Sequence, residues 1–172
     1  MARYVAQVPL RWTDQDSYRH LNHARAVTLL EEARIELMFT AAAAEGIDTF
    51  AAGLLVAGLG VEYRRQVPYR AHDLRVEMTV RDVRAASFTI DYVMREGPAE
   101  SDPVAIEAET RMALFDLAGR RPRRLTAEER AFLLRWAPEP AVTAAGTAAA
   151  ASAGTSAGTS AGTSASAAEA VS

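Results

Sequence analysis

The stretch NHARAVTLLEEARIELMFTAAAAEG, residues 22–46, decides the fold. Apolar residues recur through it at helical spacing and charged residues take the opposite side, which predicts one amphipathic helix of about 20 residues. Asn22 or His23 would stand at its N-terminal cap, and Gly46 would end it. The predicted buried stripe comprises Ala26, Leu30, Ala33, Leu37 and Ala41, flanked by Val27 and Met38.

Residues that alternate between apolar and polar on both sides of this helix predict strands. One strand precedes the helix at 4–12, with Tyr4, Ala6, Val8, Leu10 and Trp12 on one face. Four follow it, at 59–65, 74–81, 88–95 and 104–114, separated by short breaks rich in proline, glycine and aspartate. In the strand at 59–65, Tyr63 and Arg65 share one face and Arg64 takes the other.

The order of strand, long helix and four strands with short breaks predicts an α+β fold. Its antiparallel five-stranded sheet would wrap around the one long helix, which has only this sheet to pack on. Thr126 and Glu129 have the spacing of a capping box, so a short C-terminal helix should follow and run through Leu134.

The last part of the chain differs in composition from the rest. Residues 139–172 are almost entirely Ala, Gly, Ser and Thr, with Ala-Gly-Thr-Ser repeated three times from 153 to 164. Such small side chains cannot offset the entropy lost on ordering them. We therefore expect one domain at 1–138 and a disordered tail at 139–172.

Composition excludes several classes of protein. The 172 residues include no Cys, which rules out disulfides, a thiol nucleophile and Cys-ligated metals. All 19 basic residues are Arg, so lysine Schiff-base chemistry is also excluded. A net charge of −3 argues against a nucleic-acid partner, and no apolar run reaches the length of a membrane span. The N-terminus has no apolar signal core, so a cytoplasmic location is expected.

The polar segment RWTDQDSYRHLNH, residues 11–23, joins the first strand to the helix. It holds two of the three His residues and two acids close to Arg11. The first amides of a helix have no partner within the helix and favour negative charge, so polar groups collected here are well placed for chemistry.

This segment and the helix after it resemble the hotdog-fold acyl-CoA thioesterases of the 4-hydroxybenzoyl-CoA thioesterase type, and the likeness continues through the strands to about residue 125. The spacing of that family's motif is matched by Asp14, Asp16, His20, Asn22, Glu31 and Arg34. Three positions depart from it. Arg19 replaces a glycine and Ala26 a tyrosine; His23 replaces a second asparagine, although the Tol-Pal-associated bacterial branch carries His there.

The resemblance implies roles for individual residues. The Asp16 carboxylate would attack the thioester carbonyl or activate water, and a backbone amide near His23 would stabilise the oxyanion. The side chains of Asn22 and His23 would orient the carbonyl or the water. The predicted substrate-binding residues are His20, Arg19, Tyr63, Arg64 and Arg65.

Each of these residues also has a purely structural interpretation. Asp16 could cap the loop or pair with an arginine, and His20 could be a hydrogen-bonded residue of the turn. Glu31 and Arg34 could pair along the helix or contact a second subunit. Asp14 is expected to fix the loop, and the arginines near the second and third strands could lie on a solvated face of the sheet.

The function expected from the resemblance is hydrolysis of an acyl-CoA thioester by a homodimer or homotetramer with joined sheets. An acyl-carrier-protein thioesterase and a non-catalytic acyl-CoA binder are the alternatives. No metal ion and no cofactor are expected, because the His and Asp residues lack the pattern of a metal site.

Overall fold

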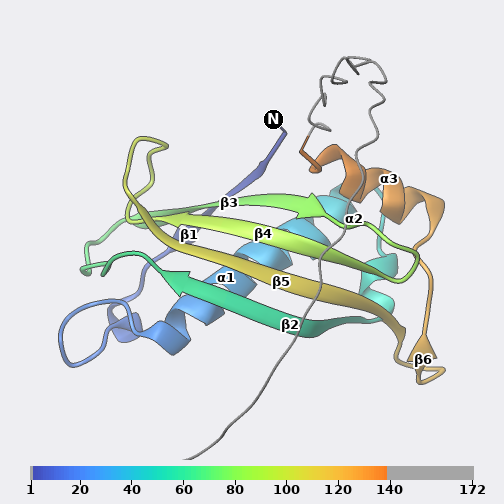
Figure 1. Ribbon diagram of the computed structural model, residues 1–172, viewed down its shortest axis with the longest axis horizontal. Helices are drawn as coiled ribbons and strands as arrows, with labels where there is room; N and C mark the ends of the chain where they lie inside the picture. The colour runs from blue at the N-terminus through green and yellow to red at the C-terminus, as the bar shows by residue number, and fades with distance from the viewer. Residues whose placement is uncertain (1, 139–172) are drawn as a thin grey trace, which may run out of the picture. The chain divides into compact units, whose positions relative to one another are not determined.

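The computed structural model describes residues 2–138, and the predicted C-terminal tail at 139–172 lies outside them. Five antiparallel strands form the sheet in the order β1-β3-β4-β5-β2 (Figure 1). They are β1 (Tyr4–Pro9), β2 (Leu54–Tyr63), β3 (Asp73–Arg81), β4 (Ser87–Arg95) and β5 (Val104–Asp116), and a two-residue strand, β6 (Arg121–Pro122), pairs with the end of β5. The predicted fold class, a curled antiparallel sheet around a long helix, is confirmed.

The long helix crosses one face of this sheet (Figure 1). It consists of α1 (His23–Ile35), a π-helical segment η2 (Glu36–Ala41) and a last turn α2 (Ala42–Ala44). Gly46 follows with φ of 79°, a left-handed conformation that glycine adopts without strain. Both ends of the predicted helix are therefore confirmed. Two short 3₁₀ turns, η1 (Trp12–Asp14) and η3 (Thr49–Ala52), precede and follow the helix.

The core lies between this helix and the inner faces of β3, β4 and β5. Alternate residues of β3 from Leu74 to Val80 are fully buried against it, as the period of two predicts. The π-helical segment has wider turns than an α-helix, so it rotates the residues that follow. For this reason Ala42, rather than the predicted Ala41, is the buried residue at the end of the stripe.

Two predicted boundaries were wrong. The first strand ends at Pro9, and Trp12 lies in η1 with 73% of its surface exposed. Asp14 accepts a hydrogen bond from the Arg11 amide, which turns the chain before Trp12 can continue the strand. Strand β2 begins at Leu54, before the predicted start at residue 59. The alternation did not reveal this start because a bulge between Val56 and Gly58 interrupts the pairing with β5.

The C-terminal helix α3 (Ala127–Arg135) begins with the predicted capping box. The Thr126 hydroxyl accepts from the Glu129 amide at 3.1 Å, and the Glu129 carboxylate accepts from the Thr126 amide at 2.8 Å. Within residues 2–138, no helix combines the length and the apolar character needed to cross a membrane.

Candidate functional site

The turn between β1 and α1 is fixed by the buried Asp14. Its carboxylate accepts hydrogen bonds from the Arg11 amide at 2.9 Å and from the Arg11 guanidinium at 3.1 Å. Its backbone carbonyl accepts from the amide of Asn22 at 2.9 Å. These contacts hold the two ends of the segment together, so the expectation that Asp14 fixes the loop is confirmed.

Asp16 occupies the middle of this turn and faces a cavity. Its Oδ1 accepts hydrogen bonds from the amides of Tyr18 at 2.8 Å and His20 at 3.1 Å, and no hydrogen bond within residues 2–138 reaches its Oδ2. The residue helps to line a pocket of about 860 Å³, together with Trp12, Thr13, Gln15, Arg19, Pro68 and Tyr69. Asp16 thus caps the turn with one oxygen, and its second oxygen has no hydrogen-bond partner within the described residues.

Arg19 has the backbone conformation of a glycine. Its φ is 64°, and its amide donates to the carbonyl of Asp16 at 3.1 Å, which closes the turn. The replacement of the family's glycine by arginine therefore keeps a turn that glycine would favour, at the cost of left-handed backbone strain. It also adds a cationic side chain to the wall of the Asp16 pocket.

His20 contributes to the turn mainly through its backbone. It forms an isolated antiparallel bridge with Pro68, and its carbonyl accepts from the Asp16 amide at 2.8 Å. Its ring Nδ1 is buried and has no hydrogen-bond partner within the described chain. His20 lines neither the Asp16 pocket nor the second pocket described below.

The start of α1 is capped by Asn22. Its Oδ1 accepts from the amides of Ala24 at 2.9 Å and Arg25 at 3.4 Å, and its carbonyl accepts from the Ala26 amide at 2.9 Å. Among the first amides of the helix, the hydrogen bonds of residues 2–138 leave that of His23 without a partner. This amide carries the positive end of the helix dipole and can stabilise a developing negative charge.

His23 lies in a second, smaller pocket of about 220 Å³. Tyr63 and Arg65 line it too, with Leu21, Ala26, Gln66, Val67 and Ile106. The Tyr63 phenol donates a hydrogen bond to the carbonyl of His23 at 2.9 Å, which ties the end of β2 to the start of α1. The Leu21 amide donates to the Val67 carbonyl at 2.8 Å, and both residues line this second pocket.

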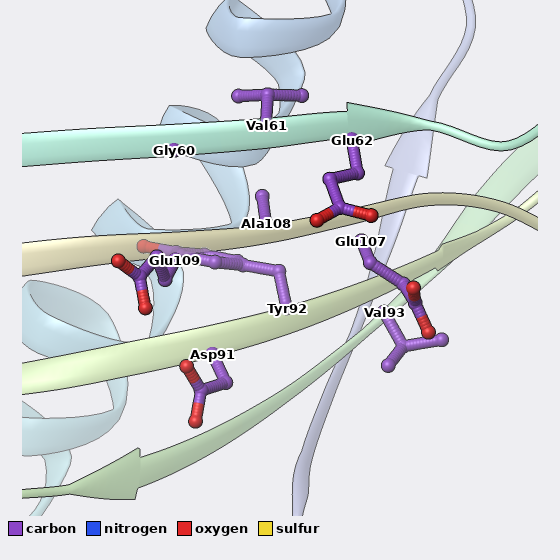
Figure 2. Close-up of a pocket in the computed structure, with 9 residues that line it drawn as sticks. All are labelled: Gly60, Val61, Glu62, Asp91, Tyr92, Val93, Glu107, Ala108 and Glu109. Carbon is purple, nitrogen blue, oxygen red and sulfur yellow. The ribbon is translucent and has the colours of Figure 1, made fainter. Parts of the chain in front are cut away.

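Arg64 lies apart from both pockets, on the outer face of the sheet. Its guanidinium pairs with Glu107 at 2.6 Å and with Glu62 at 2.5 Å. A third pocket of about 410 Å³ lies on this face, and Figure 2 shows the carboxylates of Glu62, Glu107, Glu109 and Asp91 around it. No predicted site residue lines it, and its acidic character disfavours the phosphate groups of CoA.

The predicted residues are therefore brought together in two groups. Asp16 and Arg19 share one pocket, His23, Tyr63 and Arg65 share the other, and Asn22 caps the helix beside them. Sequence reasoning missed Trp12 and Tyr69 in the Asp16 pocket. Trp12 was assigned to the strand, and nothing local to Tyr69 indicates that its loop returns to the turn. Within residues 2–138, no cluster of His, Asp and Glu is arranged to hold a metal ion.

The fold and this arrangement correspond to a known class. A curled antiparallel sheet around one long helix is the hotdog fold. Residues 10–144 match the thioesterase-like superfamily, and the chain belongs to that superfamily. A comparison with curated protein sequences found no significant match.

Solved structures with the same fold include several thioesterases. A candidate acyl-CoA thioesterase from Xanthomonas campestris is 26% identical, with a TM-score of 0.56 over 66% of this chain and 93% of the other. A candidate thioesterase from Pseudomonas aeruginosa is 25% identical, with a TM-score of 0.62 over 74% and 95%. The 1,4-dihydroxy-2-naphthoyl-CoA thioesterase from Synechocystis, at 15% identity and a TM-score of 0.65 over 77% and 96%, shares the fold alone. The match to the thioesterase-like superfamily and the likeness to these solved structures together indicate a thioester hydrolase.

Proposed function

We propose that this protein hydrolyses acyl-CoA thioesters, with Asp16 as the nucleophile or the general base. The observation that carries the proposal is the position of the Asp16 carboxylate: two amides orient it through Oδ1, and the residue lines a pocket of about 860 Å³. A thioester has a good leaving group, so one positioned carboxylate can be sufficient. The likeness to the candidate acyl-CoA thioesterase of Xanthomonas campestris supports the choice of substrate class.

In the proposed mechanism, the thioester lies between Asp16 and the start of α1. The His23 amide donates to the carbonyl oxygen and stabilises the charge that develops on it. Asp16 either attacks the carbonyl carbon, forming an anhydride that water then hydrolyses, or removes a proton from the water that attacks. In both routes the C–S bond breaks, CoA leaves as a thiolate that takes up a proton, and the free acid is released.

Arg19 and Arg65, one in each pocket, are the groups we assign to the CoA phosphates. Both are exposed, and arginine suits phosphate through its planar set of donors. Arg64 was predicted for the same role, but its two carboxylate partners already neutralise it. We therefore give Arg64 a lesser part in binding than the other two.

A homodimer joined through β2 forms part of the proposal. β2 is an edge strand of 10 residues with apolar side chains that are half exposed, including Val56, Leu59 and Tyr63. An exposed apolar edge of this length is a template for pairing with a second copy. The opposite edge, β1, has 6 residues and contains Pro9, which suits an unpaired edge.

The substitution Asp16→Asn tests the enzymatic function. We expect release of thiol from a panel of acyl-CoAs to fall about 10²–10⁴-fold, with the dissociation constant for acyl-CoA nearly unchanged. Asn keeps an oxygen that can accept from the amides of Tyr18 and His20, so the turn should survive. Equal turnover by the wild type and this variant would remove Asp16 from the mechanism.

A non-catalytic acyl-CoA binder is the second candidate, favoured by the engagement of Asp16 Oδ1 in two loop hydrogen bonds. Wild-type protein that binds acyl-CoA and releases no thiol would establish this alternative. Turnover of acyl groups attached to a carrier protein, with none from CoA, would instead identify the substrate as an acyl-carrier-protein thioester.

A further inference from the structure

A fourth pocket, of about 230 Å³, lies on the outer face of the sheet beside the connection between β3 and β4. This connection is at the end of the sheet away from the start of α1 (Figure 1). Arg111 lines the pocket and pairs with Gly58 of β2, which precedes Tyr63 by five residues, or about 17 Å. The pocket is therefore separate from the candidate active site.

The strand register fixes a row of three residues in this pocket. Arg81 of β3 lies opposite Thr89 of β4, and Thr89 lies opposite Arg111 of β5. Phe88 and Ile90, on either side of Thr89, are buried in the core, so Thr89 points to the outer face between the two arginines. Thr89 is 7% exposed, and its hydroxyl has no hydrogen-bond partner within residues 2–138. It is therefore a free donor in the wall of the pocket.

The two carboxylates that line the pocket, those of Asp82 and Glu109, both pair with Arg81. Its Nη1 donates to Asp82 at 2.6 Å and its Nη2 donates to Glu109. Its Nε donates to Asp91 at 2.7 Å, so each nitrogen of this guanidinium has an acidic partner. Arg81 thus offsets the negative charge around the pocket, and the other arginines that line the pocket do not have to.

Those other arginines are Arg84 and Arg111, and no salt bridge within the described chain involves either of them. Arg111 donates from Nη2 to the Ala57 carbonyl at 3.2 Å. Its guanidinium lies against Gly58, where an added Cβ would stand 3.2 Å from Nη2. These contacts hold the guanidinium over β2 and leave its remaining N–H groups unused.

The connection that carries Arg84 is held in place by backbone contacts. The Arg84 amide donates to the Ser87 carbonyl at 2.8 Å. From α3, the Arg130 guanidinium donates to the carbonyls of Val83 at 3.2 Å and Arg84 at 2.7 Å. Ser87 also brings a second hydroxyl to the pocket. Because the backbone around these donors is already fixed, a ligand would meet them at a reduced cost in entropy.

We propose that Arg84, Arg111, Ser87 and Thr89 form a binding site for a phosphate group. Both guanidinium groups and both hydroxyls can donate to an oxyanion, and the charge and several acceptor oxygens of phosphate suit arginine. The ligand is inorganic phosphate or the phosphate of a phosphomonoester. The site is distinct from the proposed thioesterase activity and does not depend on it.

Calorimetric titration of the full chain with inorganic phosphate, in a chloride buffer, tests the site. We expect the wild type to bind with a Kd of about 1 mM or lower. Arg84→Ala should weaken binding at least tenfold, because it removes a charged donor. Thr89→Val should weaken it about three- to tenfold through loss of one hydroxyl. Valine has nearly the same shape as threonine and suits a strand, and the melting temperature of each variant checks that it folds.

Arg124→Ala is the matched control. Arg124 is exposed and does not line the pocket, so its removal changes the net charge by the same amount and should leave the Kd unchanged. Equal affinity of the wild type, Arg84→Ala and Thr89→Val overturns the site. An absence of saturation by about 10 mM phosphate in the wild type overturns it too.

Amide chemical shifts locate the bound phosphate. Shifts confined to residues 82–89 and Arg111 support the site, whereas shifts confined to the surroundings of Arg19 and Arg65 overturn it. Adenosine 5′-monophosphate separates the two sources of the phosphate group. If it binds at the same residues, the site accepts phosphomonoesters, and if only inorganic phosphate binds, the site selects the free ion. None of these measurements uses acyl-CoA, so a failure of either proposal leaves the other intact.

Discussion

Tyr63, the last residue of β2, donates its phenolic hydrogen bond to the backbone carbonyl of His23, the first residue of α1, at 2.9 Å. The bond joins the edge strand of the sheet to the helix start that we assign to the oxyanion. Because the phenol is half exposed, it adds little to the burial of the core. Its main effect is on the position of the peptide groups around His23.

Tyr63→Phe should therefore affect catalysis more than stability. We expect kcat for the preferred acyl-CoA to fall about tenfold, since a small displacement of an oxyanion donor weakens stabilisation of the transition state. The melting temperature should change by no more than a few degrees. Steady-state kinetics and thermal unfolding of the same preparation check both statements. An unchanged kcat would show that the bond does not position the helix start.

Arg19→Gly should stabilise the protein. Arginine at φ of 64° has left-handed strain of roughly 1 kcal/mol that glycine does not have. We expect a midpoint of chemical denaturation higher by an amount equivalent to about 1 kcal/mol, with an unchanged m-value. Arg19→Ala is the matched control, because it removes the same side chain and keeps the strain. If the alanine variant gained as much stability as the glycine variant, backbone strain would not be the cause.

Asn22→Ala should destabilise α1. The side chain accepts from two amides of the first turn, and loss of such a cap costs about 1 kcal/mol, or a fall of roughly 3–5 °C in melting temperature for a domain of this size. Asn22→Asp keeps an oxygen in the capping position and should retain most of the stability. Equal losses in both variants would contradict a capping role for the Asn22 side-chain oxygen.

The strands that the sequence predicted correctly are those whose pattern depends on residues close together in the chain. Strict alternation predicted β3, β4 and β5, because those strands are buried on one face along their whole length. Alternation in β2 also predicted that Tyr63 and Arg65 lie on one face of the strand and Arg64 on the other. In the structure, Arg64 lies on the outer face. The start of β2 escaped prediction because a bulge interrupts the alternation.

Within the candidate site, local motifs were informative and long-range contacts were not. The cap at Asn22 and the turn around Asp16 depend on residues a few positions apart, so their spacing was visible in the sequence. Tyr69 reaches the Asp16 pocket through the loop after β2, and no local pattern marks that approach. Arg34 was expected to pair with Glu31 along the helix or to contact a second subunit. It does pair with Glu31, and its burial depends on the fold.

Glu77→Gln should weaken the protein and flatten its response to acid. Glu77, on the outer face of β3, is 5% exposed and pairs with Arg3, Arg75 and Arg95. Burial alone would raise its pKa, but the hydrogen bonds from the three arginines lower the pKa from 4.5 to about 2. Because the folded-state pKa is depressed, this stabilisation is present above about pH 4.5 and is lost as the pH falls toward 2.

The expected loss in Glu77→Gln is on the order of 3 kcal/mol at neutral pH. Denaturant titrations at intervals between pH 7 and pH 2 measure it, and the curves of wild type and variant should converge at the acid end. Glu100→Gln provides the control, since that exposed carboxylate also pairs with Arg3 and Arg75 and should contribute little. Curves that stay parallel down to pH 2 would contradict the depressed pKa.

Leu59→Lys should dissociate the proposed dimer. Leu59 lies on β2, is 46% exposed, and would be covered by a second copy paired along that edge. A lysine there introduces a charge on each side of the two-fold axis, and charges on an edge strand prevent pairing. Sedimentation equilibrium should show the wild type as a dimer or tetramer and the variant as a monomer. Leu134→Lys, at a similarly exposed leucine on α3, should leave the mass unchanged. If both variants remained oligomeric, the subunits would be joined elsewhere than along β2.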